Sequence, residues 1–291
     1  MRQKRDLWAR IAVSAISAVF FTSTLALGSD KLFEEFHKTY PISAQGRIEI
    51  DNLNGAVHIS SWDRNEVQVD AVKTARSKER LDEATIEVDS DANHLSIHTH
   101  YPEHDHTFWS DDRHDNPATV EYTLIVPRQA RLDEVKLVNG ALDMRDLAGE
   151  VQASCVNGRI EAQSLTGRSE LNAVNGSIEA AVERMPASTL KFSSVNGSVR
   201  VTLPSDASAD IEARTMSGSI SNDFGLSAER HRFVGSSLDG QLGSGGTLVK
   251  LSTVNGSIKI QHAADGRPLS PAKSLNRDRG RDDNDDDDDE I

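Results

Sequence analysis

The tripeptide Val-Asn-Gly and its close copies recur through this chain at a nearly fixed spacing. The first four intact copies lie 18, 18 and 21 residues apart. Intact copies begin at Val138, Val156, Val174, Val195 and Val254, and variants stand at Leu53–Gly55 and Met216–Gly218. A fixed period is the mark of repeated structural units that stack on one another. The repeat therefore constrains the fold more than any other feature of the sequence.

Each copy opens a nine-residue unit, and such units follow one another without interruption from Val138 to Val182. Glycine stands third in the unit, and apolar residues hold positions five and seven in most units, as Leu142 and Met144 do. Apolar residues that alternate with polar ones are typical of a short, half-buried strand. The glycine indicates a turn, because glycine adopts a positive φ angle at little steric cost. The pattern predicts an all-β protein.

Two architectures satisfy this pattern. In the first, two units form one coil, and coils of 18–21 residues stack as a parallel β-solenoid. In the second, Asn-Gly closes the two-residue turns of stacked β-hairpins. Identical residues at a spacing of 18, such as Asn157 and Asn175, favour the solenoid, because stacked coils place them over one another. We predict the solenoid, with an asparagine ladder, an antiparallel N-terminal portion over 62–137 and a final coil over 247–260; the hairpin stack is the alternative.

The ends of the chain differ in composition from its middle. In residues 1–28 a basic segment precedes the apolar run Ile11–Leu27, which predicts a signal peptide. The run is too short for a membrane span of ~20 residues. Residues 29–262 form the predicted solenoid domain. Residues 263–291 form a predicted disordered acidic tail, because a like-charge block such as Asp282–Glu290 cannot bury a core.

Charge and cysteine content narrow the location and the partners. The formal net charge is −14, and nucleic-acid binding needs clustered Lys and Arg, so we expect no nucleic-acid partner. Cys155 is the only cysteine, so an intrachain disulfide is excluded and we expect it to pack as a small apolar residue. Export without disulfides predicts a periplasmic or cell-surface protein of a bacterium, with no membrane span once the signal is cleaved.

The order of the motifs resembles a known family. The segments GRIEIDNLNGAVHISSWDRNEVQV and YTLIVP, the Val-Asn-Gly repeats and the closing GGTLVKLSTVNGSIKI are similar to the bacterial putative-adhesin family of unknown function. The resemblance spans roughly Phe33–Gln261. It implies an exported envelope protein with a β-solenoid-like domain, and it supplies no catalytic residues. The His/Asp-rich segment and the acidic tail depart from the family pattern.

One segment breaks the repeat and carries groups that bind metals. Residues 94–115 are rich in His and Asp, and His98 and His100 lie two apart on a predicted strand, so they share a face. Imidazoles with carboxylates suit Zn²⁺ and similar divalent ions. The spacing matches no fixed ligand motif. The predicted metal ligands are His98, His100, His104, Asp105, His106 and His114.

A second set of polar residues lies at the outward sixth position of alternate units: Asp143, Glu161, Glu179 and Arg200. Stacked carboxylates at about 4.8 Å could resemble the acid pair of a retaining glycosidase, which gives a hydrolase or lyase as an alternative function. Outward residues of a solenoid are nevertheless ordinarily polar, and the chain has no nucleophile-elbow, metalloprotease or phosphate-loop motif. We therefore predict a non-catalytic envelope protein without a cofactor, which binds an unknown envelope protein or glycan.

Overall fold

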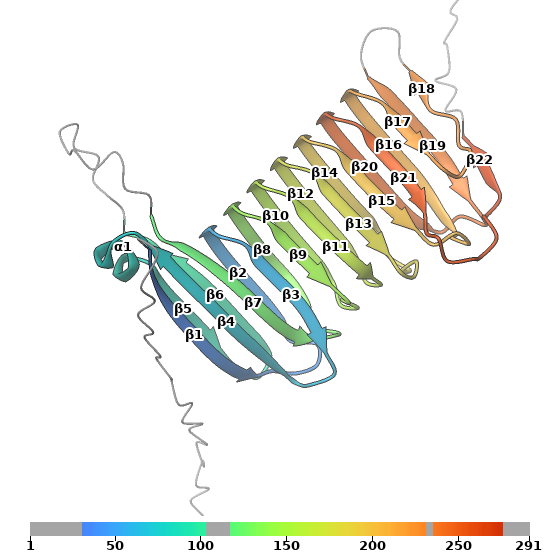
Figure 1. Cartoon of the computed structure of the whole chain (residues 1–291). Helices are drawn as coiled ribbons and strands as arrows, with labels where there is room; N and C mark the ends of the chain where they lie inside the picture. The colour runs from blue at the N-terminus through green and yellow to red at the C-terminus, as the bar shows by residue number, and fades with distance from the viewer. Residues whose placement is uncertain (1–30, 103–116, 231–234, 276–291) are drawn as a thin grey trace, which may run out of the picture.

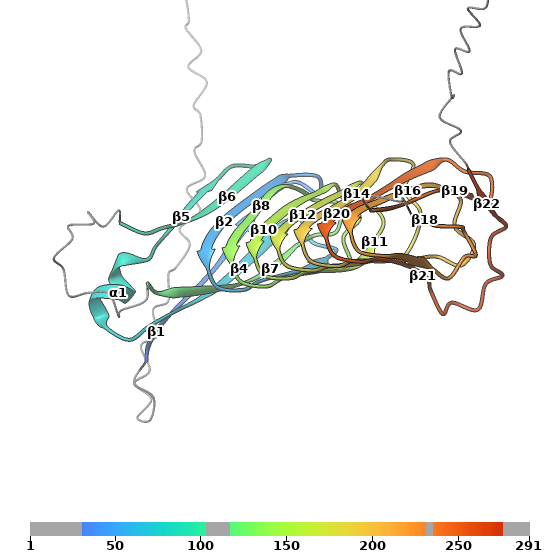
Figure 2. The same ribbon diagram turned by 90° about the horizontal axis from the view of Figure 1, so that it is seen from above.

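The computed structural model describes residues 31–102, 117–230 and 235–275. Two long β-sheets form two layers, and the short helix α1 (Lys78–Glu83) lies at their N-terminal end (Figures 1 and 2). The signal segment 1–28 and the block Asp282–Glu290 lie outside the described residues. Among the described residues, no helix is long and apolar enough to cross a membrane.

Sheet A has ten strands, and sheet B has eleven in one path with a twelfth beside it. The spatial order in sheet A is β1 (Leu32–Pro41), β4 (Glu66–Ala75), β7 (Thr119–Pro127), β3 (Val57–Trp62), β9 (Leu142–Arg145), β11 (Ile160–Leu165), β13 (Ile178–Val182), β15 (Val199–Leu203), β21 (Ile258–His262) and β17 (Ile220–Asn222). The order in sheet B is β18 (Glu229–Arg230), β19 (Ser236–Leu242), β16 (Ala209–Ser217), β20 (Thr247–Asn255), β14 (Leu190–Asn196), β12 (Ser169–Asn175), β10 (Val151–Asn157), β8 (Arg131–Asn139), β2 (Arg47–Asn54), β6 (His94–His100) and β5 (Thr85–Ser90), with β22 (Ala272–Ser274) paired to β19.

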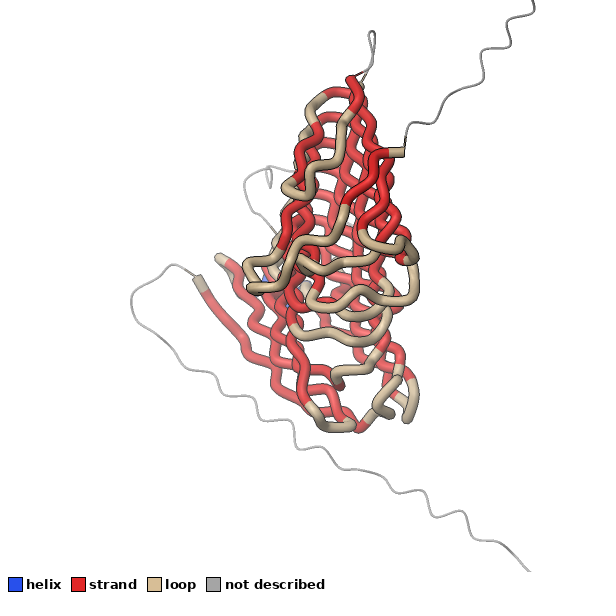
Figure 3. Tube along the Cα trace, turned by 90° about the vertical axis from the view of Figure 1, so that its right-hand side faces the viewer, coloured by secondary structure: helices blue, strands red, loops and turns tan. Residues whose placement is uncertain are grey.

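The repeat builds parallel coils, each with one strand in either sheet. Strand β10 pairs in parallel with β12, and β11 pairs in parallel with β13. Asn157 lies beside Asn175 and Ile160 beside Ile178, which is the register that the spacing of 18 predicts. The β-solenoid prediction is confirmed, and the parallel pairing excludes the hairpin stack for these strands. Figure 3 views the two layers of strands with the loops that join them.

The core is the narrow space between the two sheets. Positions five and seven point into it, and Leu142, Met144, Ile160 and Ala162 are each fully buried. Ser169 is the polar exception at position five, and its hydroxyl donates to the Gly167 carbonyl at 3.2 Å. The described core is thus mainly aliphatic, and Tyr122 and Phe192 are the largest of its fully buried side chains.

Asparagines form a continuous ladder along one corner of the solenoid. Each Asn side-chain amide donates to the Asn side-chain oxygen of the preceding coil at 2.9 to 3.0 Å. The ladder runs in the spatial order Asn54, Asn139, Asn157, Asn175, Asn196 and Asn255. The predicted ladder is therefore present, and every donor in it points toward the N-terminal end.

The glycines at this corner are required mainly by close backbone approach. A Cβ on Gly176 would lie 1.7 Å from the carbonyl oxygen of Gly158, and a Cβ on Gly197 would lie 2.0 Å from that of Gly176. Gly55 has φ +127°, but Gly176 and Gly197 do not have positive φ. The expectation that a positive φ explains the glycines is thus incomplete, because the backbones of stacked coils meet where a side chain would stand.

The order of coils in space differs from their order in sequence. Strands β20 and β21 lie between the coil of β14 and β15 and the coil of β16 and β17. Likewise β2 lies between β6 and β8, and β3 lies between β7 and β9. The segment 247–260 is therefore an interior coil, and its prediction as the final coil is wrong in space. Strands β16 and β17 lie one coil farther from β14 and β15, and the later strands β20 and β21 occupy the position between them.

Both ends of the solenoid are closed by less regular structure. At the N-terminal end, β4 pairs antiparallel with β1 and β7, and β5 pairs antiparallel with β6. The predicted antiparallel portion over 62–137 is therefore confirmed only in part, because β6 pairs in parallel with β2, β7 with β3, and β8 with β2 and β10. At the other end, β19 pairs antiparallel with β16, and β22 pairs antiparallel with β19. Ordered structure thus continues beyond His262 to Leu275, within the segment that the sequence assigned to a disordered tail.

Candidate functional site

The His/Asp-rich segment is only partly described by the structure. His98 and His100 lie on the same face of β6, with ring centroids 6.1 Å apart. The Nε2 atom of His100 lies 2.8 Å from the Glu87 carboxylate on β5, and His98 Nε2 lies 2.7 Å from the Ser96 hydroxyl. The other predicted ligands, His104, Asp105, His106 and His114, lie outside the described residues. Within the described part, no group of three His, Cys, Asp or Glu side chains is placed to hold a metal ion.

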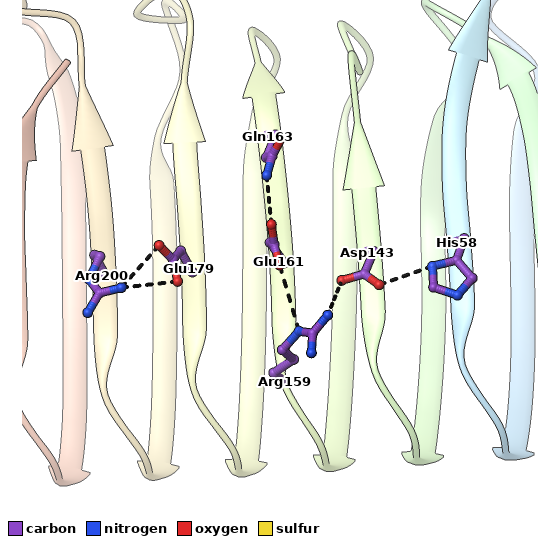
Figure 4. Close-up of polar contacts among 7 residues, drawn as sticks. All are labelled: His58, Asp143, Arg159, Glu161, Gln163, Glu179 and Arg200. Carbon is purple, nitrogen blue, oxygen red and sulfur yellow. Dashed lines mark hydrogen bonds and ion pairs between the residues drawn. The ribbon is translucent and has the colours of Figure 1, made fainter. Parts of the chain in front are cut away.

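The outward acidic row of sheet A is a network of cross-strand pairs (Figure 4). The Asp143 carboxylate lies 3.0 Å from His58 Nδ1 and 3.2 Å from an Arg159 nitrogen.

Farther along this row, Glu161 lies 3.7 Å from Arg159 and accepts a hydrogen bond from Gln163 at 2.6 Å, while Glu179 pairs with Arg200 at 3.1 Å. Each carboxylate is matched to a side chain on its own or a neighbouring strand, as in structural pairs across a sheet. The row thus gives the hydrolase alternative no pair of free carboxyl groups.

A serine, a histidine and an aspartate meet near the end of β21, which the sequence reasoning did not single out. Ser205 Oγ lies 3.2 Å from His262 Nδ1, but the serine is fully buried and its hydroxyl donates to the Ala263 carbonyl at 2.7 Å. Asp265 accepts from the Ser205 backbone amide at 3.2 Å and from the Arg267 backbone amide at 3.1 Å. Hydrogen bonding, first from Ser205 and then from the Arg267 backbone, lowers the pKa of Asp265 to about 2. These contacts hold the segment that follows β21 against Ser205.

A groove lies on the outer face of sheet B beside the Asn ladder. It encloses about 640 Å³ and crosses β10, β12, β14, β20, β16 and the start of β19. One wall is a row of exposed apolar side chains, which we call the valine row. The valine row within the groove is Val156, Val174, Val195, Val254 and Met216, with exposed fractions between 37% and 59%.

The floor of the groove holds small polar side chains two positions before each member of the valine row. These are Ser154, Asn172, Ser193 and Ser252, and Arg214 takes the equivalent place on β16. The Ser193 and Ser252 hydroxyls bond to each other at 2.6 Å. One guanidinium nitrogen of Arg214, Nη2, donates to both carboxylate oxygens of Asp239, at 2.8 and 2.9 Å. Small floor residues beside larger valines are what create the depression.

A second column of side chains lies at the base of the groove and faces the glycine backbone. Ser194 donates to the Gly176 carbonyl, Thr253 to that of Gly197 and Thr215 to that of Gly256, each at 2.9 Å. Cys155 occupies the same position, and its thiol donates to the Gly140 carbonyl at 3.3 Å. Burial raises the pKa of the Cys155 thiol. The cysteine is therefore a member of a structural column, as its expected role as a small packed residue implies.

Comparison with known proteins bears on the repeat region. Residues 148–261 match the family model described as Toastrack DUF4097, within the segment where the sequence resembles the adhesin family. None of the curated proteins compared with this sequence matches it.

Solved structures similar to this chain include a "putative cell adhesion protein" from Clostridium sporogenes, at 11% identity and TM-score 0.42 over 79% of this chain and 100% of that one. A "putative adhesin" from Bacteroides fragilis shares 12% identity at TM-score 0.29, over 79% and 97% of the two chains. Another from Parabacteroides distasonis shares 11% identity at TM-score 0.21, also over 79% and 97%.

Proposed function

We propose that this chain, whose residues 148–261 form a Toastrack DUF4097 domain, is a non-catalytic binding scaffold of the bacterial cell envelope. Its binding surface is the groove on sheet B. The observation that carries the proposal is the valine row, because contiguous apolar side chains left in water mark interaction sites more often than scattered ones do. The unidentified partner is an envelope component.

The solenoid supplies a rigid base for this surface. The Asn hydrogen bonds hold successive coils at a constant spacing. The backbones of successive coils are in close contact at the glycines of the same corner. Each coil therefore presents its valine at the same position relative to the Asn ladder. A preorganised row loses little conformational entropy when a partner covers it.

The location rests on the sequence. The basic and apolar composition of residues 1–28 supports export, and the family resemblance supports an envelope role, at the cell surface or in the periplasm.

The test compares binding of the signal-less protein to the envelope fraction of the native bacterium. We expect Val174→Asp and Val195→Asp to reduce the bound fraction at least tenfold, because each places a charge in the apolar wall. Ser177→Asp and Ser198→Asp are matched controls, since both residues are exposed in the turns that lead from this corner into the sheet A strands β13 and β15. Equal binding by all four variants would show that the groove is not the binding surface.

A second candidate function is divalent metal binding by the segment 94–115. The observation that favours it is the placement of His98 and His100 on one face beside Glu87. The proposed ligands remain His98, His100, His104, Asp105, His106 and His114. Titration of the signal-less protein with Zn²⁺ should show micromolar or tighter binding that His98→Ala with His104→Ala abolishes; binding that survives the double substitution would exclude this site.

A further inference from the structure

We infer that the groove on sheet B binds one extended hydrocarbon chain of an amphiphile, such as a long-chain fatty acid. This inference rests on the proposed function, because it assigns the ligand class to the same groove. Three observations lead to it: how the polar atoms of the lining are used, how the valine row is arranged, and how long the groove is.

The first observation is that most polar groups of the lining already have partners within the protein. Ser194, Thr253 and Thr215 donate to glycine carbonyls of the neighbouring coil. The Ser193 and Ser252 hydroxyls satisfy each other, and the Arg214 guanidinium is held by Asp239. The surface that remains for a ligand is therefore mainly carbon, although many of the residues are named as polar. Apolar lining with a few placed polar groups is typical of sites for apolar ligands.

The second observation is the line of the valine row. Each strand contributes one apolar side chain at the same register position, so neighbouring members lie about 4.8 Å apart along the solenoid axis. The row is one residue wide on each strand. A single extended chain that lies along it contacts every member in turn. An ordinary protein interface needs a broader apolar centre than one row of side chains.

The third observation is length. From β10 to β16 the groove crosses five adjacent strands, β10, β12, β14, β20 and β16, which is about 19 Å at the spacing of strands in a sheet. Carbon–carbon bonds of about 1.5 Å in a zigzag advance roughly 1.3 Å per carbon, so about 15 carbons fill this length. The head group then lies in water beyond the end of the row.

Other ligands fit the same surface less well. A glycan would bring many hydroxyls that need partners, and the groove offers few polar groups that are not already bonded. A nucleic acid or polyphosphate needs several available cations, and the one cation of the lining, Arg214, is paired. A hydrocarbon chain needs neither hydrogen-bond partners nor available cations.

The test measures binding of monomeric saturated fatty acids to the signal-less full chain, by displacement of a dansyl-labelled undecanoic acid. A methylene that is fully buried strengthens binding about fourfold, and one that is half-buried about twofold. We expect about a twofold gain per carbon from C8 upward, and no further gain beyond about C15.

Two groove variants and two controls give the readout its specificity. Ser193→Trp fills the floor and Val174→Asp places a charge on the wall, so each should weaken binding at least tenfold. Ser198→Trp and Ser177→Asp make comparable changes in the turns that lead into sheet A, outside the groove lining, and should leave affinity within twofold. Val174, Ser177 and Ser198 are exposed, whereas Ser193 is half-buried and bonded to Ser252, so the melting temperature of each variant is measured to separate a loss of binding from a folding defect.

Each alternative outcome overturns the inference in a different way. Affinity that does not depend on chain length, or that is equal in groove and control variants, rejects a hydrocarbon site. Binding to phosphatidylglycerol vesicles without binding to monomers identifies a membrane surface instead, and groove-dependent binding of neutral oligosaccharides identifies a glycan. If fatty acids fail while binding to envelope fractions remains groove-dependent, the inference is lost and the proposed function stands.

Discussion

At the residue scale, the three adjacent residues of the Val-Asn-Gly corner differ in what they contact. Asparagine bonds to the coil before it, glycine allows the two backbones to touch, and valine remains exposed. The contacts of asparagine and glycine are structural, and the exposed valine is the basis of the proposed function. Substitutions within one tripeptide should therefore have very different effects.

Gly176→Ala should be far more destabilising than its chemistry suggests. The new Cβ would lie 1.7 Å from the Gly158 carbonyl oxygen, which is backbone that cannot move aside without separating the coils. We expect a loss of about 3 kcal/mol or more in the free energy of unfolding, measured by urea denaturation. Gly225→Ala is the control, since its φ is +80° but nothing lies within 4 Å of the added Cβ; it should cost only about 1 kcal/mol. Similar losses in the two variants would contradict the close-approach account.

Asn175→Ala should have a smaller effect than Gly176→Ala. The change removes one hydrogen bond to Asn157 and one from Asn196, both at an exposed corner. At about 0.5–1.5 kcal/mol per bond, the expected loss is about 1–2 kcal/mol, because water can replace both partners. Val174→Ala, at the neighbouring exposed position, should change stability by less than about 0.5 kcal/mol. An Asn175→Ala variant as stable as Val174→Ala would show that the ladder adds no stability.

The aspartate beyond β21 should make stability depend on acid. The folded pKa of Asp265 is lowered from 3.8 to about 2 by hydrogen bonds from Ser205 and the Arg267 backbone. A lowered carboxyl pKa contributes stability that is present above the unfolded value, near pH 4, and is lost as pH falls toward 2. Asp265→Asn should therefore be less stable than the parent protein at pH 5 and equally stable near pH 2, as measured by denaturation at each pH. A stability difference that is constant with pH would show that this carboxyl is not linked to folding.

At the element scale, the sequence allowed good prediction of each coil and poor prediction of the order of coils. Register followed from spacing, because Asn157 over Asn175 and Ile160 over Ile178 satisfy the ladder and the core together. The position of β20 did not follow, because the tripeptide from Val254 to Gly256 can stack on any other copy. The groove could not be predicted from the sequence either. Finding it requires knowing that Ser193 and Ser252, far apart in sequence, become neighbours on the outer face.

The helix at the N-terminal end should depend on one buried lysine. The ammonium group of Lys73 lies 3.1 Å from the Glu34 carboxylate and donates to the Leu81 and Ala84 carbonyls, at 3.4 and 3.2 Å. Lys73→Met leaves these acceptors without their donor, so we expect a loss of roughly 2–4 kcal/mol and faster amide exchange in α1 and β1. Lys78→Ala removes only an exposed pair with Asp82 and should leave stability close to that of the parent protein, because water screens this pair. Unchanged exchange in α1 after Lys73→Met would mean that its packing, chiefly Leu81, holds the helix alone.

At the scale of the whole molecule, the chain ends in sequence and the solenoid ends in space are different places. In a solenoid each coil contacts only its neighbours, so a coil with partners on both sides is held more strongly than one at an end. Strand β20 pairs with β14 on one side and β16 on the other, although it is among the last strands of the chain. Among the strands that the structure describes, β18 and β22 each pair with β19 alone, at the end of the sheet.

This topology predicts the pattern of amide hydrogen exchange. We expect β20 and β21 to exchange as slowly as β12 and β14, because interior coils open only when the stack itself opens. Peptides from β18 and β22 should exchange at least tenfold faster, although one precedes β20 in sequence and the other follows β21. Exchange measured by mass spectrometry on proteolytic peptides resolves these segments. Protection that falls steadily from β14 to the C-terminus would contradict the interior placement of β20 and, with it, the continuity of the groove between Val195 and Met216.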